Sequence, residues 1–174
     1  MSLVLIGARG SGKSAVGVEL AQRLDYEFVD LDRAVEAAAG KSVAEIFAST
    51  SEAEFRRLET IALAGLSDRQ ETVVATGGGA VIAAQNRKIL RELGKVFWLK
   101  VSPEVAVART AGSNSRPALT ELEPLEEARE VARSRRACYE EVADEMIDTD
   151  SLALLEVCDE LEQLWRAAAR DDVR

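Results

Sequence analysis

The octapeptide GARGSGKS, residues 7–14, combines glycines, a lysine and a serine at the spacing G-x-x-x-x-G-K-[ST]. Glycines at positions 7, 10 and 12 permit backbone angles that turn successive N–H groups inward around a phosphate. Lys13 can reach the outer phosphates as a point charge, and the hydroxyl of Ser14 can bind a magnesium ion. The pattern therefore predicts a P-loop that binds a nucleoside triphosphate with Mg²⁺. The alternative is a glycine-rich turn with a stray lysine.

The residues on either side of the octapeptide supply the elements that a P-loop requires. The apolar run LVLI, residues 3–6, is typical of a buried strand. After the octapeptide, Val16, Leu20 and Leu24 recur every four residues, which is the spacing of one helix face. The octapeptide is therefore expected between a strand and a helix, whose N-terminus adds partial positive charge beside the phosphates.

Strands and helices are expected to alternate along the rest of the chain, with short connections. Strands are expected at 3–6, 26–30, 72–76, 95–101 and near 146–147. Helices are expected after residue 14, over 33–39, from 43, from 52, over 82–93, from 103, over 125–143 and from 152. Such alternation predicts an α/β fold, with a parallel sheet covered by helices on both faces. Residues 1–174 are expected to form one domain, with a mobile loop at 111–120.

The composition limits the partners. The chain has 22 Lys and Arg against 31 Asp and Glu, a net charge of −9, so no nucleic-acid or anionic-membrane partner is expected. It has no histidine, so no histidine base is available, and no zinc site is expected. Cys138 and Cys158 lie on apolar helical faces and are interpreted as core residues in a reducing compartment. No signal peptide or membrane-spanning run is visible, which favours a cytoplasmic protein.

Further motifs follow the P-loop in a fixed order. They are DLD at 30–32, EFRRLE at 54–59, TGGGAV at 76–81, and RTAGSNSRPAL at 109–119 paired with RRACYEEVAD at 135–144. Together with the P-loop, these motifs resemble the shikimate kinase family over nearly the whole chain. Each motif alone is weak, but five in register are specific.

The resemblance implies a fold, a reaction and its reactants. The fold is that of nucleoside-monophosphate kinases, a five-stranded parallel sheet in the order 2-3-1-4-5 with a mobile lid at about 111–123 and shikimate-binding helices at about 32–66. The reaction is ATP + shikimate giving ADP + shikimate 3-phosphate, on the route to chorismate and the aromatic amino acids. ATP and Mg²⁺ are required, and the protein is expected to be a monomer.

The two aspartates of DLD have separate roles in this resemblance. Asp30 is expected near the magnesium, acting through water. Asp32 resembles the residue that hydrogen-bonds the shikimate hydroxyls, including the attacking one, either to orient that hydroxyl or to accept its proton. An i, i+2 pair points to one side if the strand continues, whereas a turn would splay the two side chains apart. The alternative reading of Asp32 is an ordinary N-cap of the following helix.

Paired arginines suit the carboxylate of shikimate because a guanidinium matches the geometry of a carboxylate. The resemblance supplies Arg56, which Glu59 could hold in place, and Arg135. Arg135 also lies on the apolar stripe of its helix, whereas Arg133 and Arg136 point to the polar side. The stripe consists of Ala128, Val131, Ala132, Cys138 and Val142.

The remaining candidates bind the nucleotide or border the acceptor. Arg116 of the loop would stabilise the transferring phosphoryl group as an arginine finger does. Arg109 resembles the residue that packs on adenine, with a solvated helix-end cation as the alternative. Gly77, Gly78 and Gly79 are interpreted as backbone brought close to the shikimate ring. The expected nucleotide-binding set is Gly10, Ser11, Gly12, Lys13, Ser14, Ala15, Arg109 and Arg116.

The chain departs from the family pattern at two places. It has Arg116-Pro117-Ala118-Leu119 where R-P-L-L is usual, and Arg135-Arg136-Ala137-Cys138-Tyr139 where R-x-P-L-Y is usual. Neither change removes a charge. Two other functions stay open, a different small-molecule P-loop kinase acting on gluconate or a nucleoside monophosphate, and a catalytically idle nucleotide-binding module.

Overall fold

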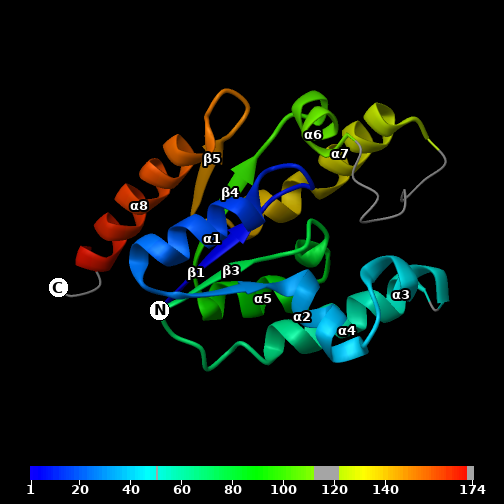
Figure 1. Ribbon diagram of the computed structural model, residues 1–174, viewed down its shortest axis with the longest axis horizontal. Helices are drawn as coiled ribbons and strands as arrows, with labels where there is room; N and C mark the ends of the chain where they lie inside the picture. Colours follow the sequence, from blue (N-terminus) through cyan, green and yellow to red (C-terminus); the bar gives the residue numbers. More distant parts are fainter. Residues whose placement is uncertain (50, 112–121, 172–174) are drawn as a thin grey trace.

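A single parallel sheet organises the molecule (Figure 1). The computed structural model describes residues 1–49, 51–111 and 122–171, the last three of these without their side chains. Five strands pair in the order β2-β3-β1-β4-β5, and every pairing is parallel. They are β1 (Ser2–Ile6), β2 (Glu27–Asp30), β3 (Thr72–Ala75), β4 (Gly94–Lys100) and β5 (Glu145–Asp148). The expected strand order and parallel arrangement are confirmed.

Helices cover both faces of the sheet (Figure 1). On one face lie α1 (Lys13–Leu24) and α8 (Leu154–Asp171), and on the other lie α4 (Glu52–Ala64), α5 (Ala84–Leu93) and α7 (Pro124–Val142). The shorter elements are α2 (Leu31–Ala39), α3 (Val43–Ser49), the 3₁₀ turn η1 (Ala80–Ile82) and α6 (Pro103–Thr110). No helix in the described ranges is both long and apolar enough to cross a membrane.

The central strand β1 separates two cores. All five of its residues are buried, as expected for a strand covered on both faces. Because side chains alternate along a strand, Leu3 and Leu5 enter the core under α1 and α8, whereas Val4 and Ile6 enter the core under α5 and α7. Cys158 is fully buried in the first core, and Cys138 packs against the second.

Three expected helix boundaries were wrong. Helix α2 begins at Leu31 rather than at 33, because the side chain of Asp30 accepts hydrogen bonds from the backbone N–H groups of Asp32 and Arg33 and thereby caps the helix. The expected helix over 82–93 is interrupted by extended backbone at Ala83, which separates η1 from α5. The closing helix starts two residues later than expected, at Leu154.

A third, smaller core joins α2, α3 and α4. Buried Val35, Ile46 and Phe55 belong to it, and the ring of Phe47 lies 5.1 Å from that of Phe55, centroid to centroid. Ser42 and Glu45 hydrogen-bond reciprocally at the start of α3 and so form a capping box. These contacts hold α4 beside the carboxyl ends of the strands.

Candidate active site

The P-loop connects the carboxyl end of β1 to α1. Gly10 and Gly12 have φ angles of 83° and 90°, a left-handed region that side chains disfavour. A Cβ atom at Gly10 would lie 2.7 Å from the carbonyl oxygen of Ala106, so space as well as torsion requires glycine there. Ser11 is buried inside the loop, while Ser14 and Ala15 are exposed in the first turn of α1.

The ammonium group of Lys13 lies inside the P-loop. Its Nζ donates to the carbonyl oxygens of Gly7 at 2.9 Å and Ala8 at 2.8 Å, and to the Oγ of Ser11 at 3.2 Å. Lys13 is only 8% exposed, and a charge this far from water attracts an anion more strongly than a surface charge does. The loop thus presents one fixed cation together with the N-terminus of α1.

Two side-chain oxygen atoms that could bind a metal ion lie next to each other beside the P-loop. The hydroxyl of Ser14 donates to Oδ2 of Asp30 at 2.7 Å, while Oδ1 of Asp30 caps α2. A hydroxyl and a carboxylate suit Mg²⁺, which prefers oxygen ligands and keeps several waters. Within the described ranges, no group of three or more His, Cys, Asp or Glu side chains could hold a metal ion. Ser14 and Asp30 would therefore share the ion with phosphate oxygens and water.

Asp32 lies in the first turn of α2, two residues beyond the end of β2. Because the strand ends at Asp30 and a helix begins, the strand geometry that would align the two carboxylates does not apply. Asp30 serves as the N-cap, and Asp32 is half-buried with its Oδ1 shielded from solvent. The reading of Asp32 as N-cap is therefore wrong.

The turn at Gly77, Gly78 and Gly79 is buried and allows two parts of the site to approach each other. A Cβ at Gly78 would lie 3.3 Å from the backbone nitrogen of Arg9, in the P-loop. A Cβ at Gly79 would lie 2.2 Å from Nη2 of Arg56. The missing side chains thus let the P-loop backbone and the Arg56 guanidinium pack on one turn.

Arg56, on α4, is held by two carboxylates. Its Nη1 donates to Glu59 at 2.9 Å, and its Nη2 donates to Glu52 at 3.1 Å. The Glu59 side chain is completely buried. Burial alone would lower the pKa of Arg56, but the attraction and hydrogen bonds of Glu59 and Glu52 outweigh it and raise the pKa. The guanidinium therefore stays charged at one end of the site.

Arg135 and Arg136 occupy different environments on α7. Arg135 is half-buried, whereas Arg133 and Arg136 are exposed, as the helix register predicted. Arg136 pairs with Glu140 at 2.7 Å on the surface. Arg135 instead lies near the Tyr139 phenol, and the charges of Arg135 and Arg56 both lower the pKa of that phenol against the effect of burial. The two arginines proposed for the shikimate carboxylate therefore face a common group.

Arg109 lies at the opposite end of the site, at the end of α6. Its guanidinium donates to the Oγ1 and the carbonyl oxygen of Thr149 at 3.1 and 2.6 Å. It also reaches the carbonyl oxygen of Gly10 at 3.4 Å, which places it beside the P-loop. Arg116 and most of the expected lid, residues 112–121, lie outside the described residues.

The sequence reasoning missed several side chains that hold the glycine turn. Tyr139 donates to the carbonyl oxygen of Gly78 at 2.6 Å. Asn86, fully buried, donates to Ala80 at 3.0 Å, and Arg87 donates to the carbonyl oxygens of Val81 and Ile82. In the sequence, the only indication of such a role was the position of Tyr139, one helical turn after Arg135.

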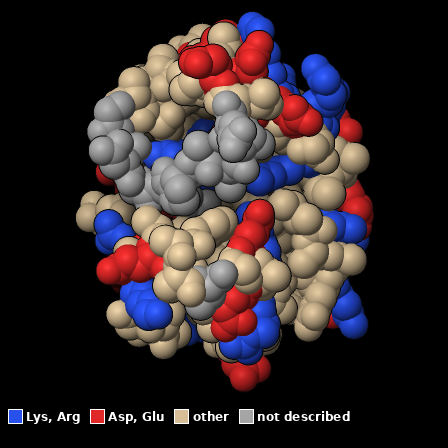
Figure 2. Space-filling view, turned by 90° about the vertical axis from the view of Figure 1, so that its right-hand side faces the viewer, with Lys and Arg blue, Asp and Glu red and all other residues tan. Residues whose placement is uncertain are grey.

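Positive charge gathers at this end of the molecule although the chain is acidic overall. Figure 2 views that end and shows Lys and Arg atoms inside the hollow between its upper and lower parts. The contacts described above place Lys13, Arg56, Arg109 and Arg135 around the site. Such local clustering suits a ligand that carries phosphate or carboxylate groups.

Fold and site together define a P-loop kinase that acts on a small acceptor. The model of the shikimate kinase family matches residues 9–165, and the chain belongs to that family. A shikimate kinase of Symbiobacterium thermophilum is 45% identical over 163 residues, which are 92% of this chain and 94% of the relative. The structure of a shikimate kinase from Acinetobacter baumannii in complex with shikimate has a TM-score of 0.92 and 35% identity, covering 96% of this chain and 93% of that one.

A gluconokinase of Sinorhizobium meliloti shares the fold, with a TM-score of 0.60 over 97% of this chain and 94% of that one. Its sequence is only 20% identical, so this likeness carries the fold alone. The family match thus favours shikimate over gluconate as the acceptor.

Proposed function

We propose that the protein transfers the γ-phosphoryl group of ATP to the 3-hydroxyl of shikimate, giving ADP and shikimate 3-phosphate for the synthesis of chorismate and the aromatic amino acids. The observation that carries this proposal is the packing of the glycine turn, residues 77–79, against two parts of the site. It packs against the P-loop backbone at Gly78 and against the Arg56 guanidinium at Gly79. A phosphate donor and a carboxylate-bearing acceptor can therefore meet at this turn.

The chain's own residues divide the work between donor and acceptor. The P-loop amides and Lys13 hold the phosphates, while Ser14 and Asp30 would hold Mg²⁺, which neutralises phosphate charge when bound. Arg56 and Arg135 bind the acceptor carboxylate. Asp32 holds the attacking hydroxyl and can take its proton as the bond to phosphorus forms. Most of the catalysis then comes from positioning and from charge stabilisation.

A substrate panel tests the proposed function directly. ADP release is measured with shikimate, gluconate, AMP or CMP as the acceptor, at equal ATP and Mg²⁺ concentrations. We expect release well above the ATP-only background with shikimate alone. Stronger release with gluconate or a nucleoside monophosphate would identify another kinase, and ATP binding without release for any acceptor would identify an idle nucleotide-binding module.

Arg135→Ala should raise the KM for shikimate and leave ATP binding almost unchanged. A charge-assisted hydrogen bond is worth roughly 1.5–3 kcal/mol, so about a ten- to hundredfold rise is expected. Arg135→Lys should recover only part of this loss, because an ammonium cannot form the paired contact of a guanidinium. Shikimate saturation kinetics on the variants and the parent measure both effects.

Arg136→Ala is the matched control, because it removes the same charge from the adjacent, exposed position. Its pair with Glu140 lies on the surface, with side chains 73% and 50% exposed, and such pairs contribute little. Its kinetics should stay close to those of the parent. A damaging Arg136→Ala beside a harmless Arg135→Ala would overturn the carboxylate assignment.

Activity should require Mg²⁺ or Mn²⁺. Ser14 and Asp30 supply only two oxygen ligands, the Oγ and Oδ2 atoms, 2.7 Å apart. The ion must therefore also bind the phosphates, and the protein's own side chains cannot take over its role. Excess chelator should stop ADP release, and restoring Mg²⁺ should recover it. Full turnover in excess chelator would contradict a metal-dependent transfer.

We further propose that the protein acts as a monomer in the cytoplasm. Cys138 and Cys158 are both free thiols, which suits a reducing compartment. Light scattering coupled to gel filtration should give a mass near the 18.8 kDa of one chain. A mass of twice that value would show a dimer.

A further inference from the structure

Tyr139 lies inside the protein, on the side of α7 that faces the sheet. It is 3% exposed, and its hydroxyl donates to the carbonyl oxygen of Gly78 at 2.6 Å. Gly78 belongs to the turn that separates the P-loop from Arg56. A side chain of α7 is thus bonded directly to the backbone on which both halves of the site rest.

The same phenol lies close to Arg135, whose charge acts on it. A tyrosine hydroxyl has one proton to donate and lone pairs to accept, so the hydroxyl that donates to Gly78 still has lone pairs available to a nearby guanidinium. Arg135 precedes Tyr139 by four residues on α7, and residues at this spacing are neighbours on a helix. The Tyr139 hydroxyl is therefore placed to act on both the glycine turn and the arginine assigned to the acceptor carboxylate.

The surroundings of the phenol keep its proton in place. Burial raises the pKa of Tyr139 to about 12, while the nearby charges of Arg135 and Arg56 act in the opposite direction. The hydroxyl is therefore a donor throughout the neutral pH range, and the hydrogen bond to Gly78 keeps one direction. Both arginines lie close enough to the phenol to influence it, so the phenol sits among the groups assigned to the acceptor carboxylate.

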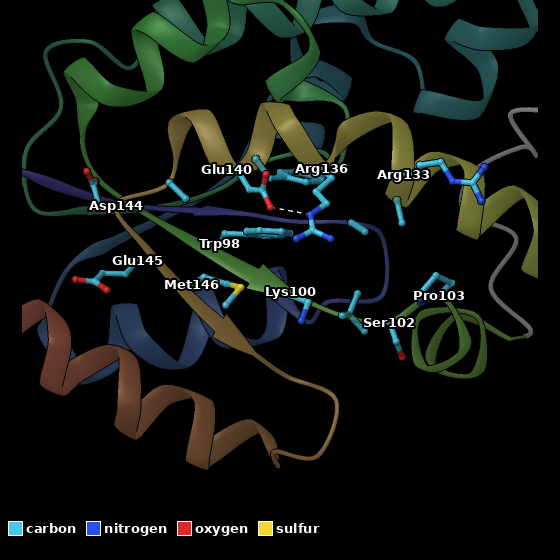
Figure 3. A pocket seen from close by; sticks show the side chains of 15 residues that line it. Trp98, Lys100, Ser102, Pro103, Arg133, Arg136, Glu140, Asp144, Glu145 and Met146 are labelled. Carbon is cyan, nitrogen blue, oxygen red and sulfur yellow. Dashed lines mark hydrogen bonds and ion pairs between the residues drawn. The ribbon is translucent and has the colours of Figure 1, made fainter.

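The ring of Tyr139 packs against the ring of Trp98, on β4. The two rings are stacked, with centroids 5.4 Å apart and planes 17° from parallel. Trp98 and Tyr139 both line a groove of about 770 Å³ between α7 and the strands β4 and β5, outside the proposed acceptor site (Figure 3). Trp98 is thus partly accessible to solvent on one side and in contact with Tyr139 on the other.

We infer that Tyr139 is a positioning residue for the acceptor. Its hydroxyl holds Arg135 and the glycine turn in one arrangement, so that the acceptor's carboxylate and ring are fixed together. The inference rests on the proposed function, because it assigns shikimate to Arg135 and the glycine turn. It adds a residue that touches neither reactant but sets where the acceptor lies.

Tyr139→Phe tests the inference, since it removes the hydroxyl and keeps the ring that stacks on Trp98. The shikimate KM should rise roughly three- to thirtyfold, less than for Arg135→Ala, because the guanidinium remains and only its positioning is lost. The ATP KM should stay within about twofold of the parent, because no contact with the P-loop side chains is lost. Tyr26→Phe is the matched control, because Tyr26 packs edge-on against Trp165 at a ring distance of 6.2 Å, in the core under α1 and α8.

A double-mutant cycle separates positioning from a merely structural role. In an Arg135→Ala background, Tyr139→Phe should add little to the shikimate KM, since the guanidinium that it positions is already gone. A purely structural role would instead lower the melting temperature with both KM values unchanged. That outcome, or effects of the two substitutions that multiply independently, would overturn the inference.

Binding can also be followed without catalysis. The chain has two tryptophans, so Trp165→Phe leaves Trp98 as the only one, stacked on Tyr139. Shikimate should change the Trp98 emission, and Tyr139→Phe should shift the titration midpoint by the same factor as the KM. A parent that releases no ADP with shikimate would refute the proposed function. An active parent with an unshifted Tyr139→Phe variant would refute only the positioning role.

Discussion

Lys13→Ala is expected to abolish phosphoryl transfer while the protein stays folded. The Lys13 ammonium is the fixed cation inside the P-loop, 8% exposed and bonded to loop oxygens at Gly7, Ala8 and Ser11. When phosphate binds, this charge faces the oxygens on which negative charge accumulates. Loss of one group that stabilises charge in the transition state commonly costs on the order of 10²–10³ in rate. Lys13 is also the only lysine of the P-loop, so no neighbouring lysine can replace it.

The fold should survive because β1 and α1 do not depend on Lys13. Their residues pair with β3 and β4 and fill the core with Leu3, Leu5, Val16 and Leu20. Lys88→Ala is the control, since Lys88 is 78% exposed on α5 and forms only a surface pair with Glu92. Steady-state ADP release is measured alongside the melting temperature. Near-normal turnover by folded Lys13→Ala would contradict the P-loop assignment.

The alternation of strands and helices could be predicted because it rests on local patterns. The continuous apolar run of β1 and the spacing of Val16, Leu20 and Leu24 are set by residues close to one another in the chain. The order of the strands came from the family resemblance, since no local pattern places β3 beside β1. The structure confirms that order.

Helix boundaries were less predictable because side chains choose among competing partners. From the sequence, Asp32 was the candidate cap of α2. Asp30 is the cap, and its second oxygen accepts from Ser14. That bond spans sixteen residues, so neither local spacing nor helix propensity could have indicated it.

Candidate site residues could be predicted where the residue type itself indicates the chemistry. Residues that only support another residue could not be predicted. Lys13, Ser14 and Arg135 stand out by type and position. Tyr139 resembles an ordinary core aromatic, and its bond to Gly78 joins positions 61 residues apart. Glu52 is a similar case, since on α4 it could equally have been a solvated surface charge.

Arg116→Ala should reduce kcat far more than it weakens ATP binding. The charge on the transferring phosphoryl group is greatest in the transition state, so an arginine that meets it there contributes mainly to kcat. Arginine fingers are worth on the order of 10³–10⁵ in rate. Arg116 itself lies outside the described residues, and its assignment follows from its place in the motif.

The described helix before this segment, α6, lies beside the P-loop and is tied to the helix after it, α7. Arg109, at the end of α6, reaches the Gly10 carbonyl oxygen, and Glu104 of α6 pairs with Arg129 of α7 at 2.7 Å. The chain therefore leaves α6 beside the phosphate site and returns on a helix tied to α6. Arg133→Ala, which removes an exposed arginine from α7, controls for the loss of one positive charge. If Arg116→Ala raised only the ATP KM and kept kcat, Arg116 would be an ordinary nucleotide-binding residue, and charge stabilisation would rest on Lys13 and the metal ion.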